Sequence, residues 1–219
     1  VRGGAEAGLG DRATYMGGSD CVTRPGFHTS RKYARMRAAG ISPDRKTPPE
    51  SISRGRGESE ETTHFSIVDR WGNGVSNTTT INGLFGSGIV VEGAGFLLNN
   101  EMDDFSVAPD TPNVYGLIDT RGANAVAPGK RPLSSMTPTI LVKDGRPFMV
   151  TGSPGGPRLI TTVLLGILNV IDYGMNVQQA VSAPRFHHQW VPDKLFVEPA
   201  TPADVVAALR ACGHPVVVS

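Results

Sequence analysis

The sequence predicts an α+β fold that follows a flexible N-terminal arm. Residues 63–81 and 139–150 each hold two strand-like stretches joined by a glycine-containing turn, which is typical of β-hairpins. Residues 157–172 carry apolar side chains at helical spacing. The 27 glycines and 17 prolines among 219 residues indicate many tight turns, without reaching the level of a disordered chain.

The length of 219 residues allows one substantial hydrophobic core. The net charge of +1 neither requires nor excludes an anionic partner. Cys21 and Cys212 lack the spacing of a disulfide framework or a metal site, and we predict no metal and no cofactor. No apolar run is long enough to span a bilayer. The chain begins without methionine and ends within the strand-like residues 215–219, so we expect a fragment of a longer protein.

The N-terminal arm is predicted to hold a short helix and a linker. Ser30 and Gly40 supply an N-cap and a stop for a helix over residues 31–39. Its cations fit a solvated helix face better than a nucleic-acid contact, since Tyr33 is its only aromatic residue. Residues 41–61 are rich in Pro, Ser and Gly, and such a linker can be cut without disturbing a core.

The first hairpin should present one polar face. Phe65 and Ile67 share one side of its first strand, and residues 69–74 form the turn. The second strand, residues 75–81, carries many hydroxyl groups and ends at Asn82. We therefore expect this strand to line a wet site.

An acidic cluster and a long loop follow. The apolar runs 89–91 and 96–98 predict a buried strand, after which come Glu101, Asp103 and Asp104. Such a cluster fits an ammonium group or a hard cation, and a solvated acidic turn is an equal alternative. Loops as long as residues 107–131, which include Tyr115, are usually lids or binding loops.

Three helices are expected in the second half. The helix over 157–172 should be well buried, with Pro157 at its start and Gly174 past its end. Asn176 and Gln179 have capping-box spacing for a second helix that ends before Pro184. A third covers 201–212, and residues 194–198 are predicted to form a strand between the second and third helices.

Gly155 and Gly156 precede the first of these helices and offer unhindered amides at the positive end of its dipole. A phosphate loop would continue with lysine, whereas Pro157 and Arg158 follow here. Ser153 does not match the nucleophile elbow of serine hydrolases. A developing oxyanion is the better fit. His187 and His188, adjacent on an extended segment, point to opposite sides and make a poor metal pair.

Thr62 is the candidate nucleophile. Cleavage of the Glu61–Thr62 bond would place a free α-amine, with an unperturbed pKa of roughly 7.7 to 8.0, beside the threonine hydroxyl. One residue would then supply both nucleophile and base. The alternative is a Thr-rich edge strand with no chemistry.

Five motifs resemble those of γ-glutamyltransferases, in the same order along the chain. They are Thr62–Ser66, Leu98–Phe105, Arg131–Met136, Gly152–Gly156 and Ala183–Gln189. The resemblance runs from about Leu9 to the end. It implies an N-terminal-nucleophile (Ntn) hydrolase, an αββα four-layer sandwich, in which residues 1–61 end the large subunit and residues 62–219 form most of the small, catalytic subunit.

The resemblance also implies a role for each residue of one acyl-transfer site. These are the nucleophile Thr62 and its hydrogen-bonding partner Thr80, then Asn82, Glu101 and Asp104 at the α-amino end of the substrate, Ser134 and Ser135 at its α-carboxylate, Gly155 and Gly156 as the oxyanion hole, and Tyr115 on a lid. The family also uses an arginine from earlier in the large subunit, and no arginine of this sequence matches it.

The expected activity is that of a γ-glutamyl transferase and glutathione hydrolase, a zymogen activated by autocatalytic cleavage between Glu61 and Thr62. Glutathione or another γ-glutamyl compound would be the donor, and water, an amino acid or a dipeptide the acceptor. The resemblance implies a heterodimer with the rest of the large subunit and a periplasmic or secreted location. The alternatives are a cephalosporin or glutaryl acylase of the same fold and a non-catalytic relative that acts as a binding or structural module.

Overall fold

The computed structural model describes residues 11–14, 30–39 and 62–219. The predicted linker, Glu61 and Cys21 lie outside these residues. The chain forms two compact units that alternate along the sequence. The hairpin unit comprises Glu58–Asp103 and Ser134–Ser182, and the loop unit comprises Val1–Gly57, Asp104–Leu133 and Ala183–Ser219.

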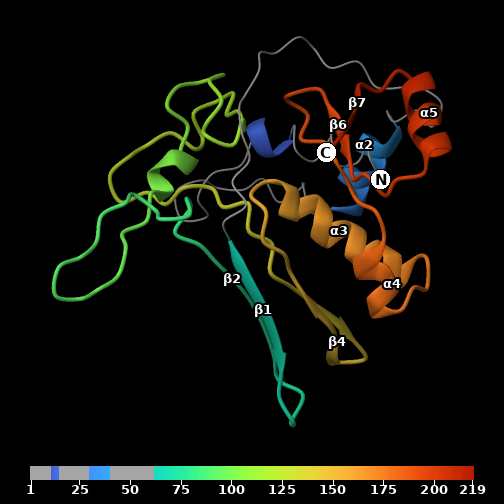
Figure 1. Ribbon diagram of the computed structural model, residues 1–219, viewed down its shortest axis with the longest axis horizontal. Coiled ribbons are helices and arrows are strands. Elements are labelled where there is room, and N and C mark those ends of the chain that lie inside the picture. Colours follow the sequence, from blue (N-terminus) through green and yellow to red (C-terminus); the bar gives the residue numbers. More distant parts are fainter. Residues whose placement is uncertain (1–10, 15–29, 40–61) are drawn as a thin grey trace. The chain divides into compact units, whose positions relative to one another are not determined.

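The hairpin unit is built on the two predicted β-hairpins, and both are confirmed. Strand β1 (Thr63–Val68) pairs antiparallel with β2 (Gly74–Thr79), and β3 (Thr139–Lys143) pairs antiparallel with β4 (Arg146–Thr151) (Figure 1). The carboxylate of Asp69 accepts hydrogen bonds from the amides of Trp71 and Asn73, which fixes the first turn. Side-chain hydrogen bonds of this kind explain why the turn residues were readable from the sequence.

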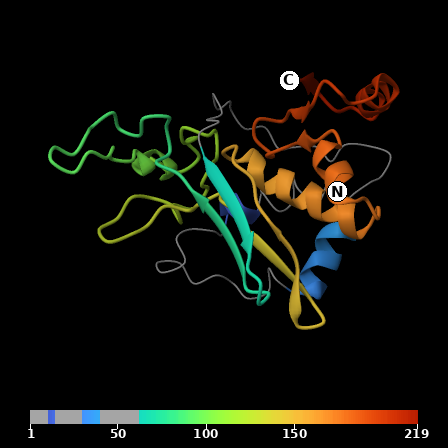
Figure 2. The ribbon, with the colours of Figure 1, turned by 60° about the horizontal axis from the view of Figure 1, so that its bottom comes forward.

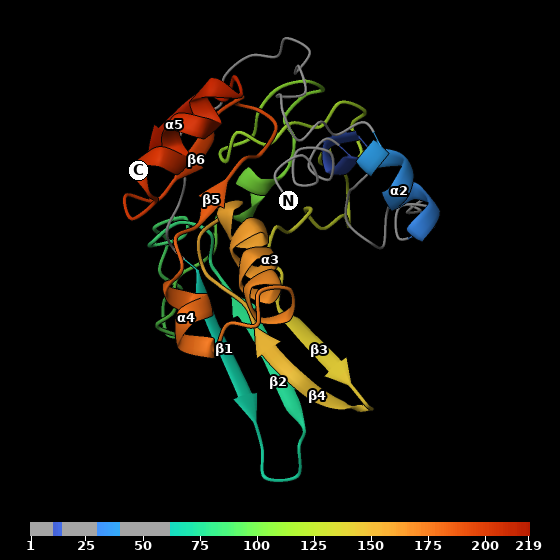
Figure 3. The ribbon, with the colours of Figure 1, turned by 90° about the vertical axis from the view of Figure 1, so that its right-hand side faces the viewer.

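One serine holds the two hairpins together. The Ser76 hydroxyl donates to the Thr151 carbonyl at 2.8 Å and accepts from the Thr139 amide at 3.1 Å. A side chain on Gly74 would meet Val150 at 3.2 Å, tighter than almost all real contacts of this type. The hairpins therefore lie side by side, as Figures 2 and 3 show.

The segment after β2 departs from the prediction. Strand β2 ends at Thr79, and residues 89–98 form only a single bridge, between Val90 and Leu97. Val90 is 61% exposed, so the expected buried strand before the acidic cluster is wrong. Gly93 and Gly95 adopt positive φ and turn the chain back before a ladder can extend. The acidic residues themselves form a short 3₁₀ helix, η2 (Glu101–Asp104).

Helix α3 (Arg158–Ile171) forms as predicted and packs against α4 (Val177–Ser182). The capping box is confirmed, because the Asn176 and Gln179 side chains each accept a hydrogen bond from the other's amide. The expectation that α3 is well buried is wrong, since Ile171 is 56% exposed. Leu164 is also exposed and lies outside the face that the described residues bury. The described residues bury Leu159, Thr161 and Val163.

The loop unit has its own small core. Strand β6 (Leu195–Val197) lies between β5 (Phe186–His187), which is antiparallel to it, and β7 (Val216–Val218), which is parallel. Helix α5 (Ala203–Ala211) covers them (Figure 3). The apolar side chains that pack here are Leu195, Val197, Val206, Phe186, Leu209 and Val216.

Two further helical pieces belong to the loop unit. Residues 11–14 are helical, and α2 spans Arg31–Ala39. The Tyr33 amide donates to the Ser30 hydroxyl at 3.1 Å, so the predicted N-cap is confirmed. Among the helices in the described part of the chain, none is long and apolar enough to cross a membrane.

Candidate active site

Thr62 and Thr80 lie at matching ends of the first hairpin. Thr62 is half-buried and immediately precedes β1, while Thr80 immediately follows β2. The register pairs Thr63 with Thr79, so continuing it by one residue sets Thr62 opposite Thr80. The Thr80 hydroxyl accepts a hydrogen bond from the Asn82 amide at 2.9 Å. This contact turns the chain after the strand.

Asn82 is brought to the acidic segment by a network that the sequence did not predict. Asn82 is 3% exposed with a φ of 74°, and its side-chain amide donates to the Asn100 carbonyl at 3.0 Å. The Asn100 side chain accepts from the Gly83 amide at 2.7 Å. Glu101, next in the chain, has its amide held by the Asn99 side chain. Asn82 and Glu101 therefore share one hydrogen-bonded corner of the hairpin unit.

The two glycines before α3 expose a pair of backbone amides. Gly155 and Gly156 have φ values of 122° and 52°, and their carbonyls accept from the first amides of the helical turn, those of Arg158 and Leu159. Neither glycine amide donates a hydrogen bond within the described residues. Two amides at the positive end of a helix form a site for an anion or an oxyanion.

The neighbouring serines have defined surroundings. The Ser153 hydroxyl donates to the Pro154 carbonyl at 2.8 Å. Ser134 is exposed, and its hydroxyl accepts from the Met136 amide at 3.0 Å. Ser135 is half-buried beside it. Both predicted carboxylate-binding serines lie in the loop that leads into β3.

Asp104 and Tyr115 belong to the loop unit, where two asparagines organise them. The Asp104 carbonyl accepts from the side-chain amides of Asn113 at 3.0 Å and Asn124 at 2.8 Å. The side-chain Oδ1 of Asn113 accepts from the backbone amides of Tyr115 and Leu117, both at 3.0 Å. The loop that carries Tyr115 is thus anchored at its base. Sequence reasoning missed both asparagines, because polar residues in a Pro/Gly/Asn-rich loop look like solvent-exposed turn formers.

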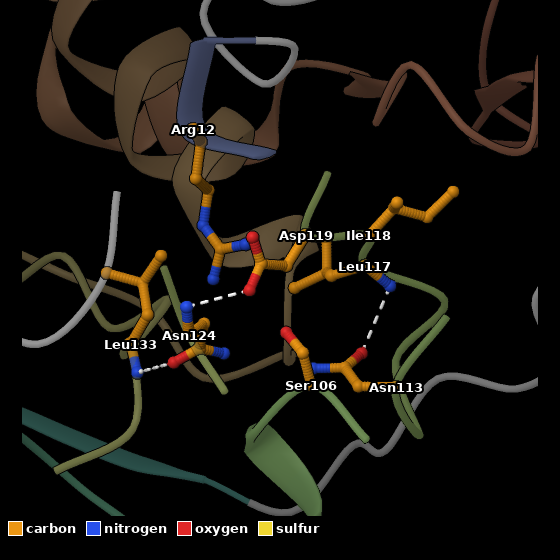
Figure 4. Close-up of a pocket in the computed structure, with 8 residues that line it drawn as sticks. All are labelled: Arg12, Ser106, Asn113, Leu117, Ile118, Asp119, Asn124 and Leu133. Carbon is orange, nitrogen blue, oxygen red and sulfur yellow. Dashed lines mark hydrogen bonds between the residues drawn. The ribbon is translucent and has the colours of Figure 1, made fainter. Parts of the chain in front are cut away.

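A small polar cavity lies beneath this loop (Figure 4). Arg12 points into it, and the Asp119 carboxylate accepts from the amides of Arg121, Ala123 and Asn124. Burial lowers the pKa of the Arg12 guanidinium to about 10, and the Asp104 carboxylate opposes that shift by raising it. The guanidinium stays charged at neutral pH, so it is a fixed cation near the predicted ammonium-binding residue.

The histidine pair is engaged with neighbouring polar side chains. His187 contacts the Gln189 side chain at 3.1 Å, and His188 contacts Asp193 at 3.2 Å. Across the residues that the structure describes, no group of three or more His, Cys, Asp or Glu side chains is placed to hold a metal ion. The Gln189 side chain also donates to the Tyr115 carbonyl at 3.2 Å, which adds a third anchor for the loop.

Comparison with curated proteins finds close relatives. The chain is 52% identical over 210 residues to a glutathione hydrolase proenzyme of Escherichia coli K12 and 45% identical over 208 residues to one of Pseudomonas aeruginosa. These matches cover 94% and 93% of this chain but 36% and 37% of the relatives. The chain therefore spans about a third of the length of these relatives.

Solved structures give the fold and the family. A γ-glutamyltranspeptidase T380A mutant of Helicobacter pylori superposes with a TM-score of 0.69 at 58% identity, over 72% of this chain and 84% of that one. A cephalosporin acylase of Bacillus halodurans gives 0.76 at 28% identity, over 98% of this chain and 36% of that one. The family profile described as Gamma-glutamyltranspeptidase matches residues 6–219. With this match over nearly its whole length and relatives about half identical to it, the chain belongs to the γ-glutamyltranspeptidase family of the Ntn-hydrolase superfamily.

Proposed function

We propose that the complete protein is a γ-glutamyl transferase and glutathione hydrolase whose nucleophile is Thr62. Cleavage between Glu61 and Thr62 would divide it into a large subunit ending at residue 61 and a catalytic subunit starting at residue 62. The donor is glutathione or another γ-glutamyl compound. The acceptor is water, an amino acid or a dipeptide.

The first step arms the nucleophile. The Thr62 hydroxyl oxygen attacks the Glu61 carbonyl carbon, the peptide C–N bond breaks, and an ester forms as the α-amine takes up the proton. Water then hydrolyses this ester and leaves a free N-terminal threonine. Its α-amine, with an unperturbed pKa of roughly 7.7 to 8.0, is a suitable base for the hydroxyl of the same residue. The Pro-, Ser- and Gly-rich linker that the sequence predicts before Thr62 suits such a cut.

In each turnover the hydroxyl attacks the γ-carbonyl carbon of the donor, and its proton passes through the α-amine to the leaving amine. Glutathione would release Cys-Gly and leave a γ-glutamyl ester on Thr62. Water or an acceptor amine then attacks the ester and frees the enzyme. Covalent catalysis of this type predicts ping-pong kinetics.

The remaining site residues are suited to different charged groups of the donor. Glu101 and Asp104 suit the α-ammonium of the donor, with Asn82 as a neutral hydrogen-bonding partner. The hydroxyls of Ser134 and Ser135 suit its α-carboxylate, and Thr80 would hold the Thr62 hydroxyl in line. The proposed lid residue Tyr115 lies in a loop that Asn113 holds through the Asp104 carbonyl and the Tyr115 amide, so the backbone of the loop has a defined position there.

The observation that carries the proposal is the pair of glycine amides before α3. They have no hydrogen-bond acceptor in the described residues, and they lie at the positive end of a 14-residue helix. A tetrahedral oxyanion would be stabilised there, and each such donor is worth about 100- to 1,000-fold in kcat. Over the aligned residues, the relative named glutathione hydrolase proenzyme is 52% identical to this chain and the cephalosporin acylase is 28% identical, which favours γ-glutamyl over glutaryl substrates.

We also propose the four-layer arrangement and the periplasmic or secreted location of the family. One face of the β1–β2 hairpin is apolar and open, since Phe65, Ile67 and Val75 are all exposed. A second sheet from the rest of the large subunit would bury this face, because exposed apolar patches of this kind are usually interfaces.

The test uses the full-length precursor and its Thr62→Ala variant. N-terminal sequencing and mass spectrometry should find a subunit beginning Thr-Thr-His-Phe in the parent and an intact chain in the variant. The mature parent should release the aniline from a γ-glutamyl-anilide and leave a glutaryl-amide untouched. Cleavage of the Thr62→Ala precursor at the parent's rate would overturn the processing mechanism, and faster turnover of the glutaryl-amide would favour the acylase.

A further inference from the structure

His64 lies beneath the proposed nucleophile. Residues 62, 64 and 66 share one face of the strand, because side chains alternate along β1. The His64 ring lies between two hydroxyls, with Nδ1 2.8 Å from the Thr78 hydroxyl across the hairpin and Nε2 2.9 Å from the Ser66 hydroxyl along the strand. Both ring nitrogens are therefore engaged, and the orientation of the imidazole is fixed.

The ring of His64 abuts Gly152, at the start of the loop that carries the two glycine amides. A methyl group built on Gly152 would overlap Cε1, Nδ1 and Nε2 of the imidazole. The backbone of Gly152 does not have a positive φ, so any residue could adopt its conformation. Glycine is required here because His64 occupies the space.

A second tie lies one residue earlier in the chain. The Ser76 hydroxyl donates to the Thr151 carbonyl, so the β1–β2 hairpin holds residues 151 and 152 by two independent contacts. Three residues later the chain reaches Gly155. The position of the glycine amides relative to β1 is thus set largely by what touches Thr151 and Gly152.

We propose that His64 is a positioning residue that sets the separation between the strand carrying Thr62 and the oxyanion loop 152–156. This inference rests on the proposed function. The imidazole acts as a spacer of fixed orientation, held by Thr78 and Ser66 and pressed against the Gly152 backbone. It touches neither the reacting atoms nor the substrate.

The role has a distinct kinetic signature. Displacing the loop moves the oxyanion donors away from the charge that develops in the transition state, and a misplacement of about 1 Å costs about 100-fold in rate. The groups proposed to hold the two charged ends of the donor lie elsewhere, so ground-state binding should change little. Loss of His64 should therefore lower kcat with KM nearly unchanged, which marks an interaction made only in the transition state.

The experiment is a double-mutant cycle in the full-length, matured protein. The variants are His64→Ala, Gly152→Ala and their combination, with all rates expressed per mole of chain whose N-terminus is Thr62. We expect Gly152→Ala alone to lower kcat on a γ-glutamyl-anilide by about 100-fold, because the imidazole and the new methyl group cannot coexist. In the His64→Ala background the same change should cost less than about 3-fold, since residues in contact give non-additive effects.

Three further variants separate the spacer role from its alternatives. His64→Phe keeps the ring but loses both hydroxyl contacts, whereas His64→Asn keeps the short contact to Thr78 but loses the ring. A spacer predicts that Phe retains more kcat than Asn. Gly166→Ala in α3 is the matched control, because Gly166 faces open space in the structure and alanine favours a helix. It should leave kcat and KM within about 2-fold of the parent.

The possible outcomes distinguish failure of the proposed function from failure of the proposed role of His64. A parent that is never cleaved at Thr62, or is inactive, overturns the proposed function itself. A parent that is cleaved and active, with Gly152→Ala equally harmful in both backgrounds, overturns the coupling between His64 and the loop. The same follows if His64→Ala lowers only the melting temperature and leaves kcat per Thr62 terminus unchanged.

Discussion

Asn124 should be worth more to this protein than any exposed residue of its loop. The residue is 6% exposed, and its side chain donates to the Asp104 carbonyl at 2.8 Å and accepts from the Leu133 amide at 2.8 Å. Alanine at this position leaves the Leu133 amide without its acceptor, which costs about 1–3 kcal/mol. The Asp104 carbonyl keeps its bond from Asn113, so the loss there is about 1 kcal/mol. The expected total is about 2–4 kcal/mol of unfolding free energy.

Urea unfolding of the full-length protein measures this loss, with Thr111→Ala as the control. Thr111 lies in the same loop, is exposed, and makes one long side-chain hydrogen bond at 3.4 Å. Its substitution should change stability by less than about 0.5 kcal/mol. Asn124→Ala should also raise KM for a γ-glutamyl-anilide, because Asp104 would lose one of its two anchors. Equal stability of the two variants would refute the view that the asparagines organise this loop.

Two more predictions follow from single residues. Gly155→Ala should lower kcat by about 100- to 1,000-fold. A φ of 122° is strained for alanine, and relaxing it would turn an amide out of the oxyanion hole. A matured variant with parental kcat would show that this amide is not an oxyanion donor. Hydrogen bonds from Asn73, then from nearby backbone amides, lower the pKa of Asp69, although burial partly opposes them. Because the folded pKa lies below the ordinary value of about 3.9, this carboxylate stabilises the hairpin above that pH and ceases to do so as the pH falls through the folded pKa. Amide exchange protection in β1–β2 should fall below pH ~3.9 in the parent and be independent of pH there in Asp69→Asn.

Local signals in the sequence predicted local structure well. The Asn176–Gln179 capping box, the Ser30 cap and the first hairpin turn depend on side chains that bond to backbone within a few residues. Such contacts form wherever the chain is placed, so spacing alone reveals them. The position of the glycine pair directly before a helix was predicted in the same way, because the signals that start a helix are also local.

The spacing of residues along the sequence could not predict contacts between segments that are distant in the chain. Residues 89–98 have strand-like composition, but within the described part of the chain they form only one bridge, between Val90 and Leu97. Ser76 looks like one more hydroxyl on a polar strand, and only the second hairpin, more than 60 residues later, gives it a role. The His64–Gly152 contact is hidden for the same reason, since neither residue is unusual in its own segment.

Two positions of the oxyanion loop require glycine for different physical reasons. Gly152 is excluded from bearing a side chain by its neighbour, whereas Gly155 has nothing within 4 Å of its missing methyl group and is constrained by its φ of 122°. A steric cause can be removed by shrinking the neighbour, but a conformational cause cannot. Removing the His64 ring should therefore rescue Gly152→Ala and fail to rescue Gly155→Ala. If His64→Ala relieved both variants alike, the loop would be a pliable segment, and the preorganised amides on which the proposed catalysis depends would lose their structural basis.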